Sequence, residues 1–311
     1  MKKKTIYEIR SLYRDNFRVT GYEFGKGKKS VCVVGSIRGN EIQQLYTCSQ
    51  LVKRLKKMEE EGKLKAGHKI LVVPSINPYS MNIKKRFWST DNTDINRMFP
   101  GYNLGETTQR IAAGVFEVIK DYEYGMQFAS FYMLGTFTPH IRMMKAGYEN
   151  VELAKKFGMP YVVLRNTRPY DTTTLNYNWQ VWETNAFSIY TTTTAEVDKE
   201  SAGMAIRSIL TFLAKEGIVE YRGHDGYQSL VVEDTDMIAV RTKNPGIFES
   251  MVKVGAEVSK GQTLAKVIDP YEGEVTEVLT APVDGLVFFA HNDPLTYADT
   301  AVFKLVAGEA L

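Results

Sequence analysis

The sequence predicts an α/β protein with a mixed, mostly parallel sheet flanked by helices, followed by a small all-β, barrel-like domain. Strand-like and helical patterns alternate through the first two-thirds of the 311 residues. After about Val219 the alternation stops, and short β-like runs with glycine turns follow. Strands that alternate with helices usually pair in parallel and are covered on both faces. We therefore expect two domains, residues 1–219 and 220–311.

The first third of the chain is expected to centre on a turn that joins a strand to a helix. A run of β-branched residues ends in this glycine-bracketed turn, GSIRGNE at 35–41. The elements around it are expected to be strands over 17–24, 29–36 and 68–78 and a helix from about Asn40 to Glu61. A long polar loop reaches from about residue 79 to 105, and its four aromatic residues argue against disorder.

The middle third continues the alternation. It predicts helices over 106–122, 149–158 and 198–217 and strands over 125–133, 159–166 and 186–195. Asp198 suits the N-cap of the last helix, and Gly217 suits its end. After residue 220 the phrase VKVGAEVSKGQTLAKV is similar to biotinyl and lipoyl carrier domains, but its lysines, Lys253, Lys260 and Lys266, lack the usual Met or Asp neighbour. A structural β module is the favoured interpretation.

Composition argues against several classes of partner. Lys and Arg number 39 and Asp and Glu 36, so no general attraction to nucleic acid or anionic lipid is expected. No stretch reaches the ~18 apolar residues that span a bilayer, and MKKK reads as a solvated terminus. Cys32 and Cys48 form no Cys-x-x-Cys motif and are interpreted as small buried apolar residues, which fits a cytoplasmic protein.

Three stretches together resemble the succinylglutamate desuccinylase and aspartoacylase family. They are GSIRGNE at 35–41, NPYSMNIKKRFWSTDNTDINRMFPG at 77–101 and GTFTPHIRM at 135–143. The middle stretch is the most specific, because its Asn-Pro, Arg86, Asp-x-Asn-Arg and Phe-Pro-Gly follow the family's order and spacing. The resemblance covers nearly the whole chain, including the C-terminal β module. It implies a zinc-carboxypeptidase-like fold and zinc-dependent hydrolysis of amide bonds.

The zinc ligands that the resemblance implies are altered in this chain. The family's turn reads Gly-x-x-His-Gly-x-Glu, where His and Glu bind zinc, whereas this sequence has Arg38 and Glu41. A guanidinium has no lone pair to offer a metal. The third family ligand is a histidine in a phrase like Asp-Leu-His, where this chain has about Ala129, and His140 could replace it only if its loop folded back. We therefore expect no metal cofactor.

The general base of the family is also not found where the resemblance places it. The family's catalytic glutamate lies in a phrase like Thr-x-Glu-x-Gly, and the corresponding phrase here is TTTTA, with Thr193 near the acidic position. A threonine hydroxyl cannot deprotonate water at neutral pH. Glu196 comes three residues later and Glu183 precedes the strand, so no catalytic residue is assigned.

The substrate-binding side of the family's site is retained. Arg86, Asn96 and Arg97 match the residues that hold the carboxylate and carbonyl of the substrate in the family, and the arginine fork meets a carboxylate with two hydrogen bonds. In this chain Arg38 is expected to pair with Glu41 and to add positive charge to the same cleft. The alternative is that Arg86, Asp94 and Arg97 only brace a long loop.

Three functions remain open from the sequence. The favoured one is a metal-free cleft that binds a small carboxylate-bearing molecule, an acyl-amino acid or peptide-like anion, through Arg38, Glu41, Arg86, Asn96 and Arg97. The second is an active deacylase of N-acyl amino acids with a rearranged metal site. The third is an oligomeric structural protein with a vestigial cleft, in which the β module makes contacts between subunits. Whether this chain is an enzyme is therefore left open.

Overall fold

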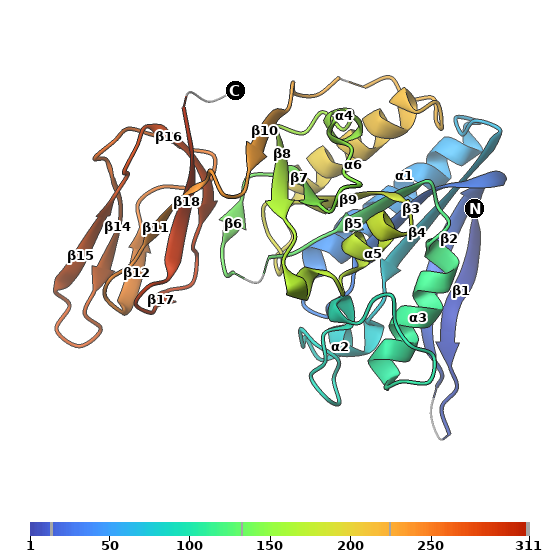
Figure 1. Ribbon diagram of the computed structural model, residues 1–311, viewed down its shortest axis with the longest axis horizontal. Helices are drawn as coiled ribbons and strands as arrows, with labels where there is room; N and C mark the ends of the chain where they lie inside the picture. The colour runs from blue at the N-terminus through green and yellow to red at the C-terminus, as the bar shows by residue number, and fades with distance from the viewer. Residues whose placement is uncertain (13–14, 132, 224, 309–311) are drawn as a thin grey trace. The chain divides into compact units, whose positions relative to one another are not determined.

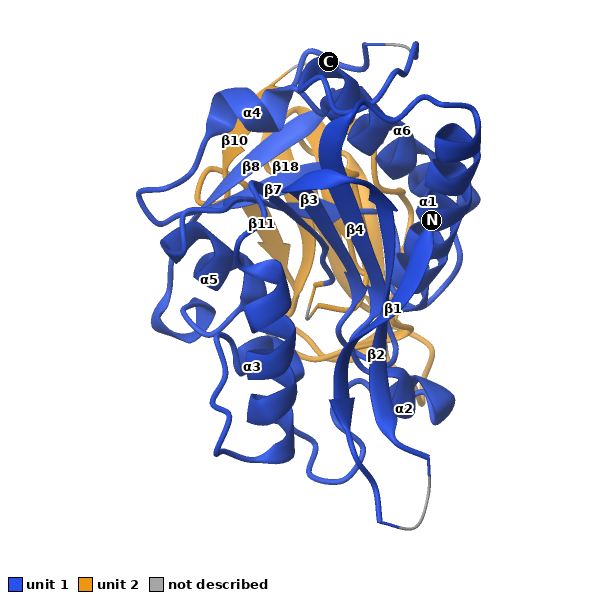
Figure 2. Ribbon diagram, turned by 90° about the vertical axis from the view of Figure 1, so that its right-hand side faces the viewer, with its two compact units in different colours: residues 1–130, 140–229 blue, residues 131–139, 230–311 orange. Residues whose placement is uncertain are grey.

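The computed structural model describes residues 1–12, 15–131, 133–223 and 225–308, which form two compact units. Unit 1 comprises residues 1–130 and 140–229, and unit 2 comprises residues 131–139 and 230–311 (Figure 2). The sequence had placed the domain boundary at 219/220. Residues 220–229 instead belong to unit 1, and the short segment 131–139 belongs to unit 2 although it lies in the middle of the chain.

The sheet of unit 1 is mixed, with its parallel strands at the centre. Its strands follow the order β1 (Lys2–Ile9), β2 (Phe17–Gly25), β4 (Gly67–Ser75), β3 (Gly27–Ser36), β5 (Tyr124–Phe128), β9 (Asn185–Tyr190), β7 (His140–Lys145) and β8 (Tyr161–Asn166). Strand β3 pairs in parallel with β4 and β5, β5 with β9, and β7 with β8. The other neighbouring pairs are antiparallel. The predicted mixed, mostly parallel sheet is confirmed.

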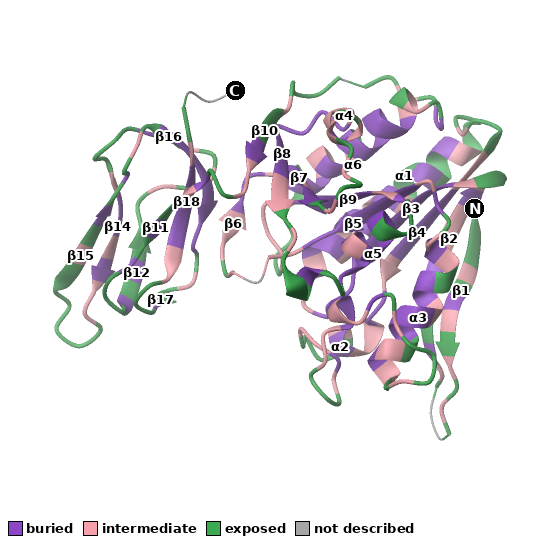
Figure 3. Cartoon of the chain, viewed as in Figure 1, coloured by how far each residue is buried: buried purple, intermediate pink, exposed green. Residues whose placement is uncertain are grey.

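Helices cover both faces of this sheet (Figure 1). One face is covered by α1 (Ile42–Glu60), α4 (Val151–Lys155) and α6 (Lys199–Lys215), the other by α3 (Thr107–Ile119) and α5 (Leu175–Val181). Side chains alternate along β3, so that Val31 and Val33 pack on the α1 side and Cys32 and Val34 on the α3 side. The central strands are therefore buried on both faces (Figure 3).

Several local predictions change in the structure. Lys2 and Lys3 of the lysine-rich start are exposed, as expected, but they belong to the edge strand β1, in which Ile6 is buried. Helix α5 was not anticipated, and the strand expected over 125–133 ends at Phe128. Residue 132 of that expected strand lies outside the described residues, as do 13, 14, 224 and 309–311. Both cysteines are free and buried, as expected.

The long loop after β4 is ordered by aromatic contacts. It contains the short helix α2 (Pro78–Asn82) and the 3-10 turn η1 (Ile95–Arg97), and a second 3-10 turn, η2 (Pro169–Asp171), follows β8. The ring of Tyr79 lies 5.1 Å from that of Phe17 and stacks on Trp88 at 5.9 Å. These contacts agree with the expectation that the aromatic residues of the loop argue against disorder.

Unit 2 consists of antiparallel sheets. One sheet has the order β11 (Ile238–Arg241), β18 (Ala301–Ala307), β16 (Gly285–Ala290) and β13 (Glu257–Val258), with β6 (Thr136–Phe137) also paired to β16. The other has the order β15 (Val275–Thr280), β14 (Thr263–Ile268), β12 (Gly246–Ser250) and β17 (Leu295–Thr296). Strand β10 (Leu230–Glu233) precedes them. The small all-β module is confirmed.

Across the described residues, no helix has the length and apolar character needed to cross a membrane.

Candidate functional site

The turn that follows β3 lies where several strands of the sheet end together. Strand β3 ends at Ser36, and its parallel neighbour β5 ends at Phe128, so residues 37–41 and 129–130 meet at one edge of the sheet. Gly39 is needed where this turn touches the long loop. A Cβ added at Gly39 would lie 2.3 Å from the carbonyl oxygen of Lys85. The Gly39 amide donates to the carbonyl of Arg86 at 3.1 Å, which ties the loop to the turn.

The carboxylate of Glu41 is buried and fully engaged. Only 1% of Glu41 is exposed. Its Oε2 accepts hydrogen bonds from the backbone amides of Ile37 at 2.8 Å and Arg38 at 2.9 Å. Its Oε1 accepts from Arg38 Nη1 at 3.0 Å and from Ser130 Oγ at 2.5 Å. These four hydrogen bonds commit both oxygens of Glu41 within the protein.

The guanidinium of Arg38 is held between two carboxylates. Arg38 is 6% exposed. In addition to Glu41, its Nη2 donates to Asp94 Oδ2 at 2.8 Å, and its Nε lies 3.1 Å from the same oxygen. Nη1 also reaches Ser130 Oγ at 3.3 Å. Burial opposes the charge of Arg38, but Glu41 and Asp94 outweigh it and raise the pKa of Arg38 above its ordinary value. Arg38 is therefore a permanent cation within the site.

The residues at the family's zinc positions do not fit a zinc ion. Arg38 donates hydrogen bonds and has no lone pair, Ala129 has no donor atom, and Glu41 is saturated by its four donors. His140 begins β7, is 1% exposed, and its ring stacks on Tyr190 with centroids 4.6 Å apart. Within residues 1–12, 15–131, 133–223 and 225–308, no three His, Cys, Asp or Glu side chains could hold a metal together.

The candidates for a general base lie away from the carboxylates. Thr193 lies in the loop after β9, where its hydroxyl donates to the carbonyl of Glu196 at 2.8 Å. The Glu196 side chain is exposed. Glu183 lies in the turn after α5, in left-handed backbone with φ of 63°, and is also exposed. None of these three residues contacts Arg38 or Glu41 through an interaction that the structure describes.

Arg86 differs from Arg38 in having no carboxylate partner. It is half-buried, its guanidinium makes no hydrogen bond or ion pair with a described residue, and it lies over the ring of Phe87 at 5.5 Å. Burial, and then the positive charges of Arg38 and Arg97, lower the pKa of Arg86 from its ordinary value against the opposing effect of Glu41 and Asp94. Arginine stays protonated despite this shift, so Arg86 is a cation that can still bind an anion.

Asn96 and Arg97 lie on η1, and the positive charge of Arg97 acts on Arg86. Asn96 is 7% exposed, and its Oδ1 accepts from the amide of Leu175 at 3.2 Å, which fixes the side chain. Its Nδ2 donates to none of the described residues and remains available. Arg97 Nη1 donates to the carbonyl of Tyr170 at 2.6 Å and lies 3.6 Å from Asp171. Arg97 therefore also braces the loop, but only one of its nitrogens is used.

The structure brings together Arg38 and Glu41 by direct contact and places Arg86, Asn96 and Arg97 on the adjoining loop. Sequence reasoning missed Ser130, which contacts both Arg38 and Glu41, and it assigned Asp94 to the loop, whereas Asp94 binds Arg38. The position of Ser130 at the end of a strand parallel to β3 was the signal that could have found it.

A mixed sheet with charged groups at the carboxyl ends of its central parallel strands defines an α/β protein with a candidate binding site at that edge. The chain belongs to the succinylglutamate desuccinylase/aspartoacylase family, because the sequence model of that family's catalytic domain matches residues 27–213. That match includes the turn, the long loop and the strands that meet at the site.

Relatives and solved structures agree with this assignment. The chain is 23% identical over 278 residues to N-alpha-acetyl-L-2,4-diaminobutyric acid deacetylase of Halomonas elongata, covering 84% of this chain and 76% of that protein. It matches a succinylglutamate desuccinylase/aspartoacylase from Rhodobacter sphaeroides with a TM-score of 0.77 at 20% identity, covering 94% and 90% of the two chains. The product-bound ectoine utilization protein EutE of Ruegeria pomeroyi gives 0.77 at 19% identity, with the same coverage. These structures share the fold.

Proposed function

We propose that this family member binds a small carboxylate-bearing molecule, an acyl-amino acid or peptide-like anion, and lacks the zinc-dependent hydrolysis of its family. One observation carries the proposal. Where the family has zinc ligands, Arg38 forms a buried ion pair with Glu41 at 3.0 Å, and that carboxylate has no oxygen free for a metal. The guanidinium of Arg38 takes the place of the zinc cation that the family binds.

The anion is expected to bind at Arg86. This guanidinium has no acidic partner among the described residues, and its planar fork suits a carboxylate. The amide nitrogen of Asn96 is free to donate to a carbonyl of the same ligand, and Arg97 adds positive charge. Arg38 and Glu41 contribute indirectly, since they hold the turn against which the Arg86 backbone lies.

Metal analysis tests the absence of zinc. The protein is purified without a chelator, and its zinc content is measured by elemental analysis. We expect much less than one zinc per chain, because the donor atoms of Arg38, Glu41 and Ala129 do not suit the ion. One tightly held zinc per chain would overturn the proposal.

A binding titration tests the ligand class. We expect N-acetyl-L-glutamate to give saturable heat in isothermal titration calorimetry, and its diamide, which lacks both carboxylates, to give none. Equal binding of the acid and the diamide would argue against a carboxylate site. The control variant Arg54→Leu should bind N-acetyl-L-glutamate as the natural chain does. Arg54 is exposed and lies on α1 beyond the first three turns of the helix.

An active deacylase is the second candidate, and the name of the Halomonas elongata relative favours it. The deciding assay incubates the protein with N-acetyl and N-succinyl amino acids, with and without added zinc. Release of free amine that zinc stimulates and Glu41→Ala abolishes would establish this candidate and reject the first. We expect no such release.

A further inference from the structure

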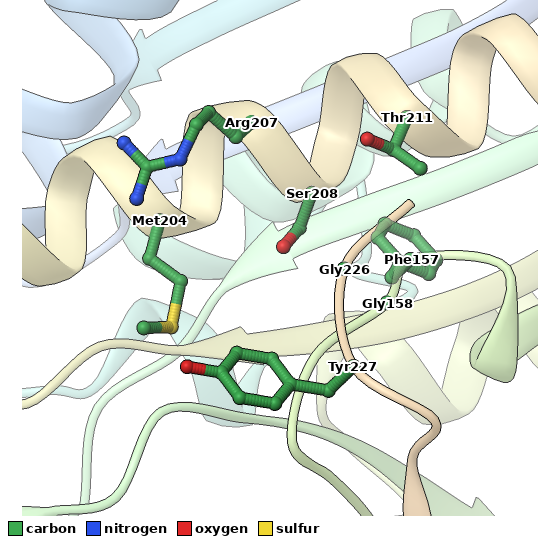
Figure 4. A pocket seen from close by; sticks show the side chains of 8 residues that line it. All are labelled: Phe157, Gly158, Met204, Arg207, Ser208, Thr211, Gly226 and Tyr227. Atoms are coloured by element: carbon green, nitrogen blue, oxygen red, sulfur yellow. The ribbon is translucent and has the colours of Figure 1, made fainter. Parts of the chain in front are cut away.

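A pocket along α6 shares no residue with the site around Arg38 and Arg86. It has a volume of about 350 Å³ and lies within unit 1, between α6 and the segment that carries Tyr227 (Figure 4). Pockets that hold small ligands begin at about 300 Å³. The cavity is therefore large enough for a ligand with a single ring system.

Two residues of α6 that line this pocket carry hydroxyl groups without a partner among the described residues. Ser208 is 6% exposed and Thr211 is 7% exposed, and neither hydroxyl makes a hydrogen bond with a described residue (Figure 4). Serine and threonine within helices commonly bond to the carbonyl one turn earlier. Thr47 in α1 does so, donating to the carbonyl of Gln43 at 2.8 Å. The hydroxyls of Ser208 and Thr211 are thus polar groups with unused hydrogen-bonding capacity in a half-open pocket.

The wall opposite the helix is built by two glycines. The amide of Tyr227 donates to the carbonyl of Gly158 at 2.8 Å. A Cβ at Gly158 would lie 2.5 Å from the carbonyl oxygen of Asp225, and one at Gly226 would lie 2.5 Å from that of Gly158. Both glycines have positive φ, 65° and 82°. Only glycine at both positions allows this approach, which sets the backbone of Tyr227 across from α6.

The remaining lining is apolar except for one cation. Phe157 is fully buried at one end, Met204 lines the helix side, and Tyr227 is 51% exposed (Figure 4). Arg207 adjoins Ser208 on α6, and its guanidinium forms no ion pair or hydrogen bond with any residue in the described ranges. The pocket thus offers an aromatic surface, two hydroxyls and one uncompensated positive charge.

We propose that this pocket is a second ligand site and that it binds a small aromatic carboxylate. The ring of the ligand packs on Tyr227 and Met204, where apolar surface leaves water. Its carboxylate accepts from Arg207 and from the hydroxyl of Ser208 or Thr211, which gives those donors a partner. A neutral aromatic molecule would leave the charge of Arg207 unpaired, and an aliphatic one would forgo the aromatic stacking.

Calorimetric titration of the full chain with naphthalene-1-acetate tests the proposal. We expect one saturable site. Ser208→Met places a long side chain in the cavity and should abolish binding, with circular dichroism to confirm that the variant is folded. Arg207→Gln and Tyr227→Ala change exposed side chains, so the fold is retained, and each should weaken binding about tenfold. Arg86→Leu should leave it unchanged, which separates this pocket from the proposed acyl-amino-acid site.

Three results would overturn the proposal. The first is no saturable binding at any concentration at which the probe is soluble. The second is equal binding of the neutral naphthalene-1-acetamide, which would remove the carboxylate from the ligand class. The third is binding that survives Arg207→Gln and Tyr227→Ala but is lost in Arg86→Leu, which would place the probe in the other site.

Discussion

Arg38 and Arg86 lie on either side of one backbone contact, yet their surroundings differ completely. Arg38 is 6% exposed and donates to two carboxylates and a hydroxyl. Arg86 is half-buried and has no anionic partner among the described residues. A charge that the protein itself neutralises is committed to structure, whereas one left unpaired is available to a ligand. The comparison separates a cation that is neutralised within the protein from one that, under the proposed function, binds a carboxylate ligand.

The largest effect is expected at Arg38. In Arg38→Leu, Glu41 and Asp94 would remain in place without their cation, and breaking a buried ion pair in this way costs about 3–5 kcal/mol. Urea denaturation followed by circular dichroism measures the loss. The control Arg86→Leu should change the free energy of unfolding by less than about 0.5 kcal/mol, as for other substitutions outside a network.

A companion variant shows whether the loss comes from the uncompensated carboxylates. Arg38→Met combined with Glu41→Gln and Asp94→Asn removes the charges together, and we expect it to recover part of the stability lost in Arg38→Leu. If Arg38→Leu proved as stable as the natural chain, the structural role assigned to this arginine would be wrong.

The second effect concerns binding. Arg86→Leu should weaken the binding of N-acetyl-L-glutamate by roughly ten- to a hundredfold, because a charge-assisted hydrogen bond contributes about 1.5–3 kcal/mol. Calorimetry on the variant and on Arg54→Leu measures it. Unchanged affinity in Arg86→Leu would show that the ligand binds at another site. The difference between the two arginines would then have no bearing on ligand binding.

The sequence predicted the parts of this contrast that depend on residue type and local order. The alternation of strands and helices gave the mixed sheet, and the presence of arginine at position 38 was enough to exclude one zinc ligand. The pairing of Arg38 with Glu41 could be anticipated because the two residues share one turn. Local spacing was sufficient in each case.

Partners that are distant in sequence could not be predicted in the same way. Asp94 and Ser130 reach Arg38 only because the long loop and β5 converge on the turn. Strand β1 could not be recognised from the sequence because one face is exposed and rich in lysine. Helix α5 could not be recognised because it is short and rich in asparagine. Tertiary contacts decide these elements, and they overrode weak local signals.

A smaller effect is expected from Ser130. Its hydroxyl donates to Glu41 Oε1 at 2.5 Å and accepts from Arg38. Ser130→Ala leaves the ion pair intact and removes one of four donors to the carboxylate, so the cost should be about 1 kcal/mol. Urea denaturation compares it with Ser49→Ala, whose hydroxyl is exposed on α1 and should matter little. A loss as large as that of Arg38→Leu would show that the hydroxyl, rather than the guanidinium, compensates Glu41.

The smallest effect is the response to salt, and it distinguishes the two arginines without changing the Arg38 cluster. Screening acts on charges that solvent reaches, over about 10 Å at 0.1 M ionic strength, and acts much less on buried pairs. Binding of N-acetyl-L-glutamate should therefore weaken by a few-fold between about 0.05 and 0.5 M sodium chloride. The stability difference between the natural chain and Arg38→Leu should not change over that range.

The residual binding of Arg86→Leu should lose the salt response, since the charge of Arg86 is gone. If that variant responded to salt as the natural chain does, another cation would be the anchor for the carboxylate, and Arg97, which has only one nitrogen engaged, would be the next to replace.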